Sequence, residues 1–166
     1  MRDIESIIRA RYVGAPQTTE AALEALVRGT SRDFECLVER VFSAMGYKTR
    51  LTPARKDGGR DIIAIDDRAG RSGRILIECK RYSGSVGVAH ARQLHGVVTT
   101  EQATKGIIVS TGAFTRGAED YCRQHDRLEL IPGKSLVLLL NEFLGPRWGL
   151  RIDSLVRDSL AGSADA

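Results

Sequence analysis

Two acids and a lysine carry the strongest chemical signal in this sequence: Asp61, Glu78 and Lys80. Glu78 and Lys80 lie two residues apart in the run I-L-I-E-C-K. Because side chains of a strand alternate between its faces, the acid and the ammonium group share one face. If residues 61–65 pair with this run as a hairpin, Asp61 at the open end lies near both of them across the ladder. Two carboxylates and a lysine would then converge.

This set of groups suits a hard divalent cation that acts on a phosphodiester. Mg²⁺ prefers oxygen ligands, keeps several waters, and binds through one or two protein carboxylates together with substrate phosphate. The metal can polarise a phosphoryl oxygen and lower the pKa of a bound water, while a nearby lysine stabilises charge in the transition state. We therefore expect Mg²⁺ as the cofactor, with Mn²⁺ as a substitute.

Positive charge is concentrated around these residues. The whole chain has a formal net charge of +4, yet residues 47–81 alone contain ten Lys or Arg against five acids. Clustered positive charge attracts a polyanion through electrostatic steering and counterion release. A solvated basic hairpin explains the same pattern, so charge by itself leaves both interpretations open.

Length and composition indicate a globular domain. The chain has 166 residues, of which 42% are hydrophobic and 28% charged, which fits one domain with a sizeable core. No apolar run approaches the roughly 20 residues that a membrane span needs, and the N-terminus has acids where a signal peptide needs a basic start. The three cysteines lack a C-x-x-C pair and are expected to be reduced. We expect a cytoplasmic protein with no membrane association.

Periodicity predicts the elements that position these groups. Apolar residues recur at helical spacing over 34–45, behind a capping signal at Thr30 and Asp33, and Gly46 ends this helix. Further elements are expected as strands at 47–52, 61–65 and 74–80, a helix at 86–102, a strand at 106–110, a helix at 115–125, a strand at 128–131 and a helix at 135–144. This order predicts an α/β fold with a mixed central sheet and helices on both faces.

Four motifs follow one another in the order of a known family: D-F-E-C-L-V-E-R-V-F-S-A-M-G-Y, D-G-G-R-D, I-E-C-K-R-Y and S-T-G-A-F-T-R-G-A. They resemble the Mrr-like restriction endonucleases of the PD-(D/E)xK superfamily, over about residues 33–140. The resemblance implies a restriction-endonuclease-like three-layer core. Together with the helical pattern of the N-terminal segment, it predicts an N-terminal helical arm at 1–30, a nuclease domain at 31–141, and a C-terminal helix and tail at 142–166.

The resemblance assigns roles to the convergent residues. It implies that Asp61 and Glu78 are metal ligands, that Lys80 is the catalytic lysine, and that the backbone carbonyl of Cys79 completes the metal shell. Many Mrr-like members have Gln where this chain has Glu78. The site is therefore similar to the acidic version common elsewhere in the superfamily, which favours metal binding and weakens assignment to the narrowest subfamily.

Two helical residues are weaker candidates. Glu35 lies at the margin of the apolar stripe of the 34–45 helix, where an acid can face the site. Related nucleases often carry a glutamate there that reaches the metal, whereas an ordinary carboxylate near a helix N-terminus is the alternative. Gln93 is interpreted either as a partly buried amide aimed at the active-site strands or as a helix-packing residue. Glu39 lies further round the first helix and is expected to be solvated.

Further candidates for support or DNA contact surround the predicted strands. Ser110 and Thr111 follow a buried strand, at a place that supplies hydroxyls and N–H groups to phosphates. Arg81 and Tyr82 follow Lys80 and could contact the DNA backbone, with turn packing as the alternative. Arg60, beside Asp61 in the basic segment, is a further candidate.

The expected function is metal-dependent endonucleolytic hydrolysis of DNA phosphodiester bonds, of the restriction or DNA-defence type. DNA rather than RNA is expected from the resemblance. A Holliday junction or other branched DNA is an alternative substrate, because junction resolvases share this fold and motif order. An alternative of another class is a DNA-binding module that acts only within a larger defence or repair assembly. A homodimer is expected, because two strands must be cut.

Overall fold

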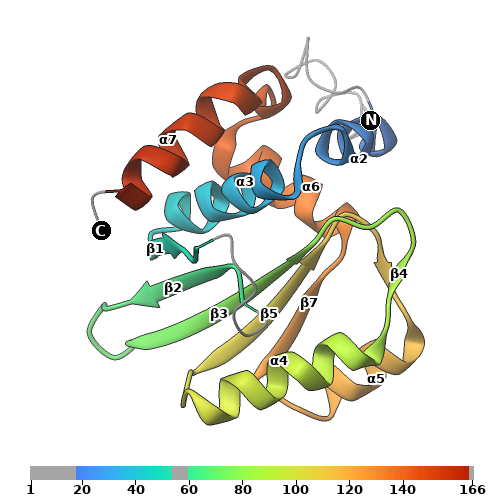
Figure 1. Cartoon of the computed structure of the whole chain (residues 1–166), viewed down its shortest axis with the longest axis vertical. Coiled ribbons are helices and arrows are strands. Elements are labelled where there is room, and N and C mark those ends of the chain that lie inside the picture. Colours follow the sequence, from blue (N-terminus) through green and yellow to red (C-terminus); the bar gives the residue numbers. More distant parts are fainter. Residues whose placement is uncertain (1–17, 54–59, 165–166) are drawn as a thin grey trace, which may run out of the picture.

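A five-stranded mixed sheet forms the centre of the molecule (Figure 1). The computed structural model describes residues 18–53 and 60–164. The strand order is β1 (Lys48–Leu51), β2 (Ile62–Asp66), β3 (Gly73–Lys80), β5 (Lys105–Ser110) and β7 (Leu128–Ile131). β1, β2 and β3 pair antiparallel, whereas β3, β5 and β7 run parallel. The predicted mixed α/β sheet is confirmed.

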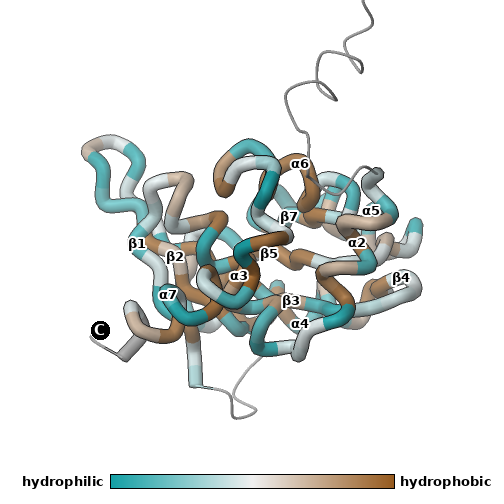
Figure 2. The backbone as a smooth tube through the Cα atoms, turned by 90° about the horizontal axis from the view of Figure 1, so that it is seen from above, coloured by the Kyte–Doolittle hydropathy of each residue, from teal (hydrophilic) through white to brown (hydrophobic). Residues whose placement is uncertain are grey.

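Helices cover both faces of this sheet. One face carries α2 (Thr19–Arg28), α3 (Ser31–Ala44), α6 (Gly133–Leu144) and α7 (Ile152–Ala164), and the other carries α4 (Val88–Thr100) and α5 (Arg116–Arg123). A short 3-10 helix, η1 (Trp148–Arg151), precedes α7. Figure 2 shows hydrophobic β5 and α6, and a hydrophilic turn between β2 and β3. The molecule therefore has the expected three layers.

Strand alternation divides the interior into two cores. Ile62 and Ile77 pack with α3, α6 and α7, whereas their chain neighbours Ile63 and Leu76 pack with α4 and α5. All four side chains are buried. Because β2 is apolar on both faces, a slip of one residue would exchange the two sets, so packing against both helical layers fixes its register.

The helix that begins at Ser31 starts and ends as its sequence predicts. The Thr30 hydroxyl accepts the N–H of Asp33 at 3.1 Å, and the Asp33 carboxylate accepts the N–H of Thr30 at 2.7 Å. This reciprocal capping box satisfies two amides that the helix itself leaves free. Gly46, with φ +96°, lies just past the helix end in a conformation that glycine tolerates without strain.

The C-terminal segment packs on the nuclease-like core. α7 lies against α3, and α2 lies against α6. Trp148 is fully buried, and its indole N–H donates to the Asn141 side-chain oxygen at 2.9 Å. Within residues 18–53 and 60–164, no helix has the length and apolar character that crossing a bilayer requires.

Two loops at the end of β3 and β5 meet at backbone distance, which the sequence did not predict. They contain the short parallel pair β4 (Ser85–Val86) and β6 (Ala113–Phe114). The Thr111 N–H donates to the Lys80 carbonyl at 3.1 Å. A Cβ added to Gly112 would lie 2.0 Å from the Gly84 carbonyl oxygen. The chain immediately after Lys80 is thus held against the chain after β5.

Replacing Gly112 by Ala should disturb this contact. Because the obstacle is backbone, no side-chain rotation relieves it, and we expect Gly112→Ala to lower the free energy of unfolding by about 1 to 3 kcal/mol in urea denaturation. Gly84→Ala is the control, since a Cβ there meets nothing within 4 Å. Equal stability of the two variants would contradict the proposed close packing.

Candidate active site

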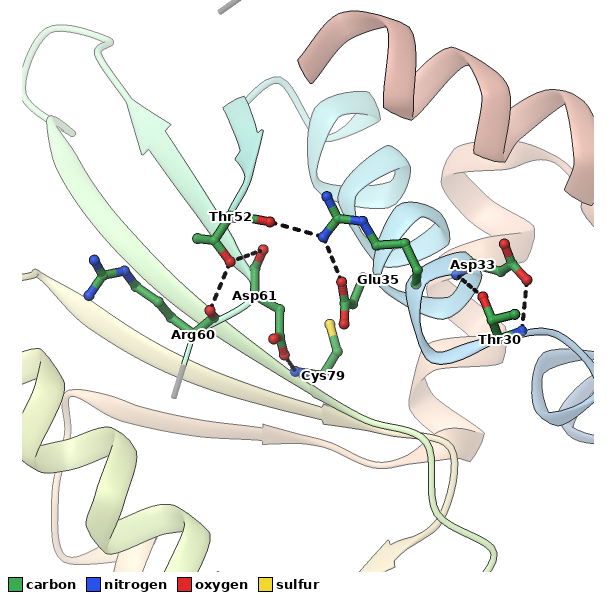
Figure 3. A network of polar contacts seen from close by, with 8 residues as sticks. Thr30, Asp33, Glu35, Thr52, Arg60, Asp61 and Cys79 are labelled. Atoms are coloured by element: carbon green, nitrogen blue, oxygen red, sulfur yellow. Dashed lines mark hydrogen bonds and ion pairs between the residues drawn. The ribbon is translucent and has the colours of Figure 1, made fainter. Parts of the chain in front are cut away.

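Asp61 lies at the open end of the β2–β3 hairpin and bonds to β3 through its side chain (Figure 3). The ladder pairs Ile62 with Ile77, and the Asp61 N–H donates to the Ile77 carbonyl at 2.8 Å. The Asp61 Oδ2 then accepts the N–H of Cys79 at 2.6 Å. The carboxylate therefore takes the place that a strand carbonyl would hold. The hairpin predicted from the sequence is present, with Asp61 where the prediction put it.

Glu78 and Lys80 form an ion pair on the face of β3 that α4 covers. The Lys80 Nζ lies 2.7 Å from the Glu78 Oε1. The Glu78 side chain is only 4% exposed, against 23% for Lys80. The second carboxylate oxygen, Oε2, is buried and has no hydrogen-bond partner within the described part of the chain. A buried carboxylate oxygen without a partner is costly, so this atom has capacity for a ligand.

Glu35 reaches toward the same place from α3, with a partner that the sequence analysis missed. The Arg32 guanidinium donates to the Glu35 Oε2 at 2.8 Å and to the Thr52 carbonyl at 3.0 Å. Figure 3 shows Glu35, Thr52 and Asp61 around this network. The spacing of Arg32 and Glu35 on one helix could have indicated the pair. The link to Thr52 depends on how α3 lies against the strands.

Burial raises the pKa of all three acids. For Glu78 the Lys80 ammonium partly offsets the rise, and the neighbouring Asp61 charge adds to it. For Asp61 the pKa is lowered in part by the Cys79 N–H and then by Lys80 and Arg32. For Glu35 burial dominates over the Arg32 bond, and Asp61 again raises the pKa. The negative charge of three partly desolvated carboxylates thus exceeds the positive charge of Arg32 and Lys80. A bound cation would compensate this excess.

The backbone N–H and carbonyl of Cys79 point to the edge of β3 at which Asp61 lies. The Lys80 carbonyl bonds to Thr111 on the β5 side of β3. Because the peptide groups of successive strand residues point to opposite edges, the N–H and the carbonyl of Cys79 both point to the β2 side. The N–H meets Asp61 there. The carbonyl therefore lies at the edge that its expected role as a metal ligand requires.

The available donors fit a hard cation rather than zinc. Asp61, Glu78 and the Cys79 carbonyl present oxygen, the ligand type that Mg²⁺ prefers. Outside the undescribed residues 1–17, 54–59 and 165–166, no three His, Cys, Asp or Glu side chains gather as a ready metal cluster. A site with few protein ligands suits Mg²⁺, which completes its octahedron with waters and phosphate.

Two of the expected DNA-contacting arginines are committed to the protein itself. Arg60 pairs with Glu101, at the end of α4, and Arg81 donates to the Val27 carbonyl of α2 at 2.7 Å. Elsewhere in the basic hairpin Lys48 pairs with Asp67 and Arg68 with Asp66, where Arg68 holds the pKa of the Asp66 carboxyl at about 2. Local pairing therefore accounts for part of the positive cluster.

Of the remaining weaker candidates, some are buried and support the backbone, and others are exposed. Ser110 and Thr111 are buried: the Ser110 hydroxyl accepts the Gly112 N–H at 3.0 Å, and the Thr111 hydroxyl donates to the Tyr82 carbonyl at 2.7 Å. They support the end of β3 and offer no surface to a phosphate. Tyr82 is 45% exposed and stays available for DNA contact. Gln93 is exposed, so the expectation of a partly buried amide aimed at the strands is wrong.

Two further residues differ from expectation. Glu39 is buried, with 6% exposure, and accepts a hydrogen bond from the Thr49 hydroxyl, because α7 and β1 both pack on α3. The expectation of a solvated Glu39 is therefore wrong. His90, from the first turn of α4, was not among the predicted site residues, yet its Nδ1 lies 3.8 Å from the Glu78 Oε1. No periodic pattern marks it, because it depends on how α4 lies over β3.

Comparison with known proteins decides the family. A family model described as restriction endonuclease, Mrr_cat, matches residues 26–140, which is more than half of the chain. This chain belongs to the Mrr-like restriction endonuclease family. The curated relatives include the type IV methyl-directed restriction enzyme EcoKMrr of Escherichia coli (strain K12), 26% identical over 128 residues, covering 74% of this chain and 42% of the relative. The expected family is confirmed.

Solved restriction endonucleases share the fold. AspBHI, a DNA modification-dependent restriction endonuclease, matches with a TM-score of 0.69 at 21% identity, over 86% of this chain and 40% of that one. MspJI, solved in complex with a 27-mer oligonucleotide, matches with a TM-score of 0.65 at 23% identity, over 87% and 36%. The restriction-endonuclease-like core is thereby confirmed. The chain spans less than half the length of these three relatives, and none of the three supports the resolvase or the binding module.

The Asp61 bond makes a prediction about stability. Asn at this position keeps an oxygen that can accept the Cys79 N–H, whereas Ala leaves that amide without its partner. We expect Asp61→Ala to unfold at lower urea than Asp61→Asn, with a difference of about 1 to 3 kcal/mol, the usual range for a partly buried hydrogen bond. If both variants have the same stability, the bond does not hold the hairpin end.

Proposed function

We propose that this chain is a Mg²⁺-dependent endonuclease that hydrolyses DNA phosphodiester bonds with water as the nucleophile. The observation that carries the proposal is the Asp61 carboxylate fixed on the Cys79 N–H, beside the buried Glu78–Lys80 pair. Membership in a restriction endonuclease family supports DNA as the substrate. The name of one solved neighbour, MspJI with an oligonucleotide, agrees with that choice.

Each residue of the site has a distinct task in this proposal. Asp61, Glu78 and the Cys79 carbonyl would hold the metal, because Asp61 bonds to the Cys79 N–H and its charge acts on the neighbouring Glu78 carboxylate. When bound, Mg²⁺ supplies Lewis-acid polarisation of the phosphate and lowers the pKa of water. Lys80, aligned by Glu78, stabilises negative charge on the phosphoryl oxygens. Glu35, which shares its electrostatic environment with Asp61 and is held by Arg32, supports the metal shell.

The substrate class within DNA is duplex DNA in this proposal. Two of the similar proteins have names that refer to methyl-directed or modification-dependent restriction. Cleavage should therefore be measured on methylated and unmethylated plasmids, and on a four-way junction. A homodimer, a cytoplasmic location and a larger defence or repair assembly stay predictions from the sequence.

Plasmid cleavage with Mg²⁺ or Mn²⁺ tests the chemistry. We expect Asp61→Asn and Lys80→Ala each to lower the cleavage rate by at least about 100-fold, the usual loss when one group that stabilises transition-state charge is removed. Lys105→Ala is the matched control, because Lys105 pairs with Glu129 at the other end of β5. Wild-type protein that binds DNA and never cuts any of the substrates refutes the proposal, as do both mutants cutting at the normal rate.

Metal binding has a readout that needs no cleavage. A cation that binds only the folded site stabilises the protein by RT ln(1 + [L]/Kd), or about 1.4 kcal/mol at ten times Kd. We expect Mg²⁺ to raise the melting temperature of the wild type relative to EDTA, and Asp61→Asn to abolish the increase. Asp66→Asn is the control, because Asp66 lies at the other end of β2 and should keep the increase. An identical increase in all three proteins would place the cation elsewhere.

A further inference from the structure

His90 lies beside the group formed by Asp61, Glu78 and Lys80. It belongs to the first turn of α4, on the face of the sheet opposite α3 and Glu35. Its Nδ1 lies 3.8 Å from the Glu78 Oε1, and its ring centroid lies 6.3 Å from that of Tyr82. The carboxylates are thus flanked by Glu35 from one helical layer and by His90 from the other.

The two nitrogens of the His90 ring have different surroundings. Nδ1 is buried and has no hydrogen-bond partner among the residues that the structure describes, yet the side chain is 29% exposed. The exposure therefore belongs to other atoms of the side chain, which include the distal edge with Cε1 and Nε2. A carboxylate beside Nδ1 favours the tautomer that carries its proton on Nδ1, as in other carboxylate–histidine pairs. Nε2 is then an unprotonated acceptor.

His90 offers the site an acceptor that does not belong to a proposed metal ligand. An attacking water needs an acceptor to orient one of its O–H bonds. Lys80 cannot serve, because an ammonium group has three donors and no lone pair. Asp61 Oδ2 accepts from Cys79 and Glu78 Oε1 pairs with Lys80, while the partnerless Glu78 Oε2 is the atom offered to the proposed metal. Glu35 lies in the opposite helical layer and is held by Arg32.

We propose that His90 is a catalytic residue whose Nε2 accepts a hydrogen bond from the attacking water, with the Glu78 carboxylate beside Nδ1. This inference rests on the proposed function, since it presupposes hydrolysis at this site. His90 would orient the water, and Lys80 would face the phosphate. Both residues lie beside the Glu78 Oε1, and in this proposal His90 is the acceptor and Lys80 the donor.

Three substitutions of His90 distinguish the contribution of Nε2 from that of Nδ1. The amide of Gln reaches about as far as Nε2, the amide of Asn about as far as Nδ1, and Ala reaches neither. We expect single-turnover cleavage to fall roughly 10- to 100-fold in His90→Ala and His90→Asn, the range for losing one hydrogen bond in the transition state. His90→Gln should keep most of the rate. DNA affinity in EDTA should stay within about twofold in all three, because no phosphate contact is lost.

His125→Gln is the matched control. His125 follows α5 and lies in a half-buried ring cluster with His95 of α4 and Tyr121 of α5. It should cut at the wild-type rate. Melting temperatures of all variants identify any loss of fold.

The tautomer can be read without metal, DNA or activity. Imidazole nitrogen-15 shifts of the full chain should report a protonated Nδ1 and a bare Nε2 for His90. The reverse tautomer overturns the inference, as does a wild-type rate in His90→Ala, recovery by Asn in place of Gln, or a loss of DNA affinity that parallels the loss of rate. If the wild type itself never cuts, the proposed function fails, whereas cutting that ignores His90 removes this inference alone.

Discussion

The hydrogen bond from the Cys79 N–H to the Asp61 carboxylate is the contact on which the candidate site depends. It ends the β2–β3 ladder with a side chain in place of a carbonyl, and so fixes an acid against the strand that carries Glu78 and Lys80. The register behind it is determined by packing, because Ile62 and Ala64 face one core and Ile63 the other. A slip of one residue would bury the wrong face and move Asp61 away from Glu78. The two cores thus position the site.

That position leaves the site short of positive charge. Glu35, Asp61 and Glu78 are partly or fully removed from water, and each has its pKa raised mainly by burial. Arg32 and Lys80 are the nearest cations, and each already bonds one acid. Such an arrangement costs stability in the isolated protein. A divalent cation would relieve the cost, so the same burial that destabilises the acids favours metal binding.

The chain that follows the ends of β3 and β5 is held by several contacts. Thr111 bonds the backbone on both sides of Arg81, Gly112 lies against Gly84 without room for a Cβ, and Arg81 reaches back to α2. Polar residues that could have faced DNA therefore serve as scaffold. Their rigidity has a function, because Lys80 and the start of α4 with His90 are held relative to Glu78. Tyr82, which is 45% exposed, keeps a surface available for DNA contact.

The sequence alone predicted most helices and strands of the core and the hairpin that brings Asp61 to β3. Local signals are encoded by neighbours in the chain, so the Thr30–Asp33 cap, the strand 128–131 and the shared face of Glu78 and Lys80 followed from spacing. The position of Asp61 near Glu78 and Lys80 could be predicted only on the condition that residues 61–65 form a hairpin with β3. The tertiary structure decided what depends on how layers pack: that α4 brings His90 to Glu78, that α7 and β1 bury Glu39, and that Arg60 and Arg81 bond within the protein. Periodicity in a single sequence predicts the face of a helix or strand on which a residue lies. Only the packing of separate elements determines which residues contact that face.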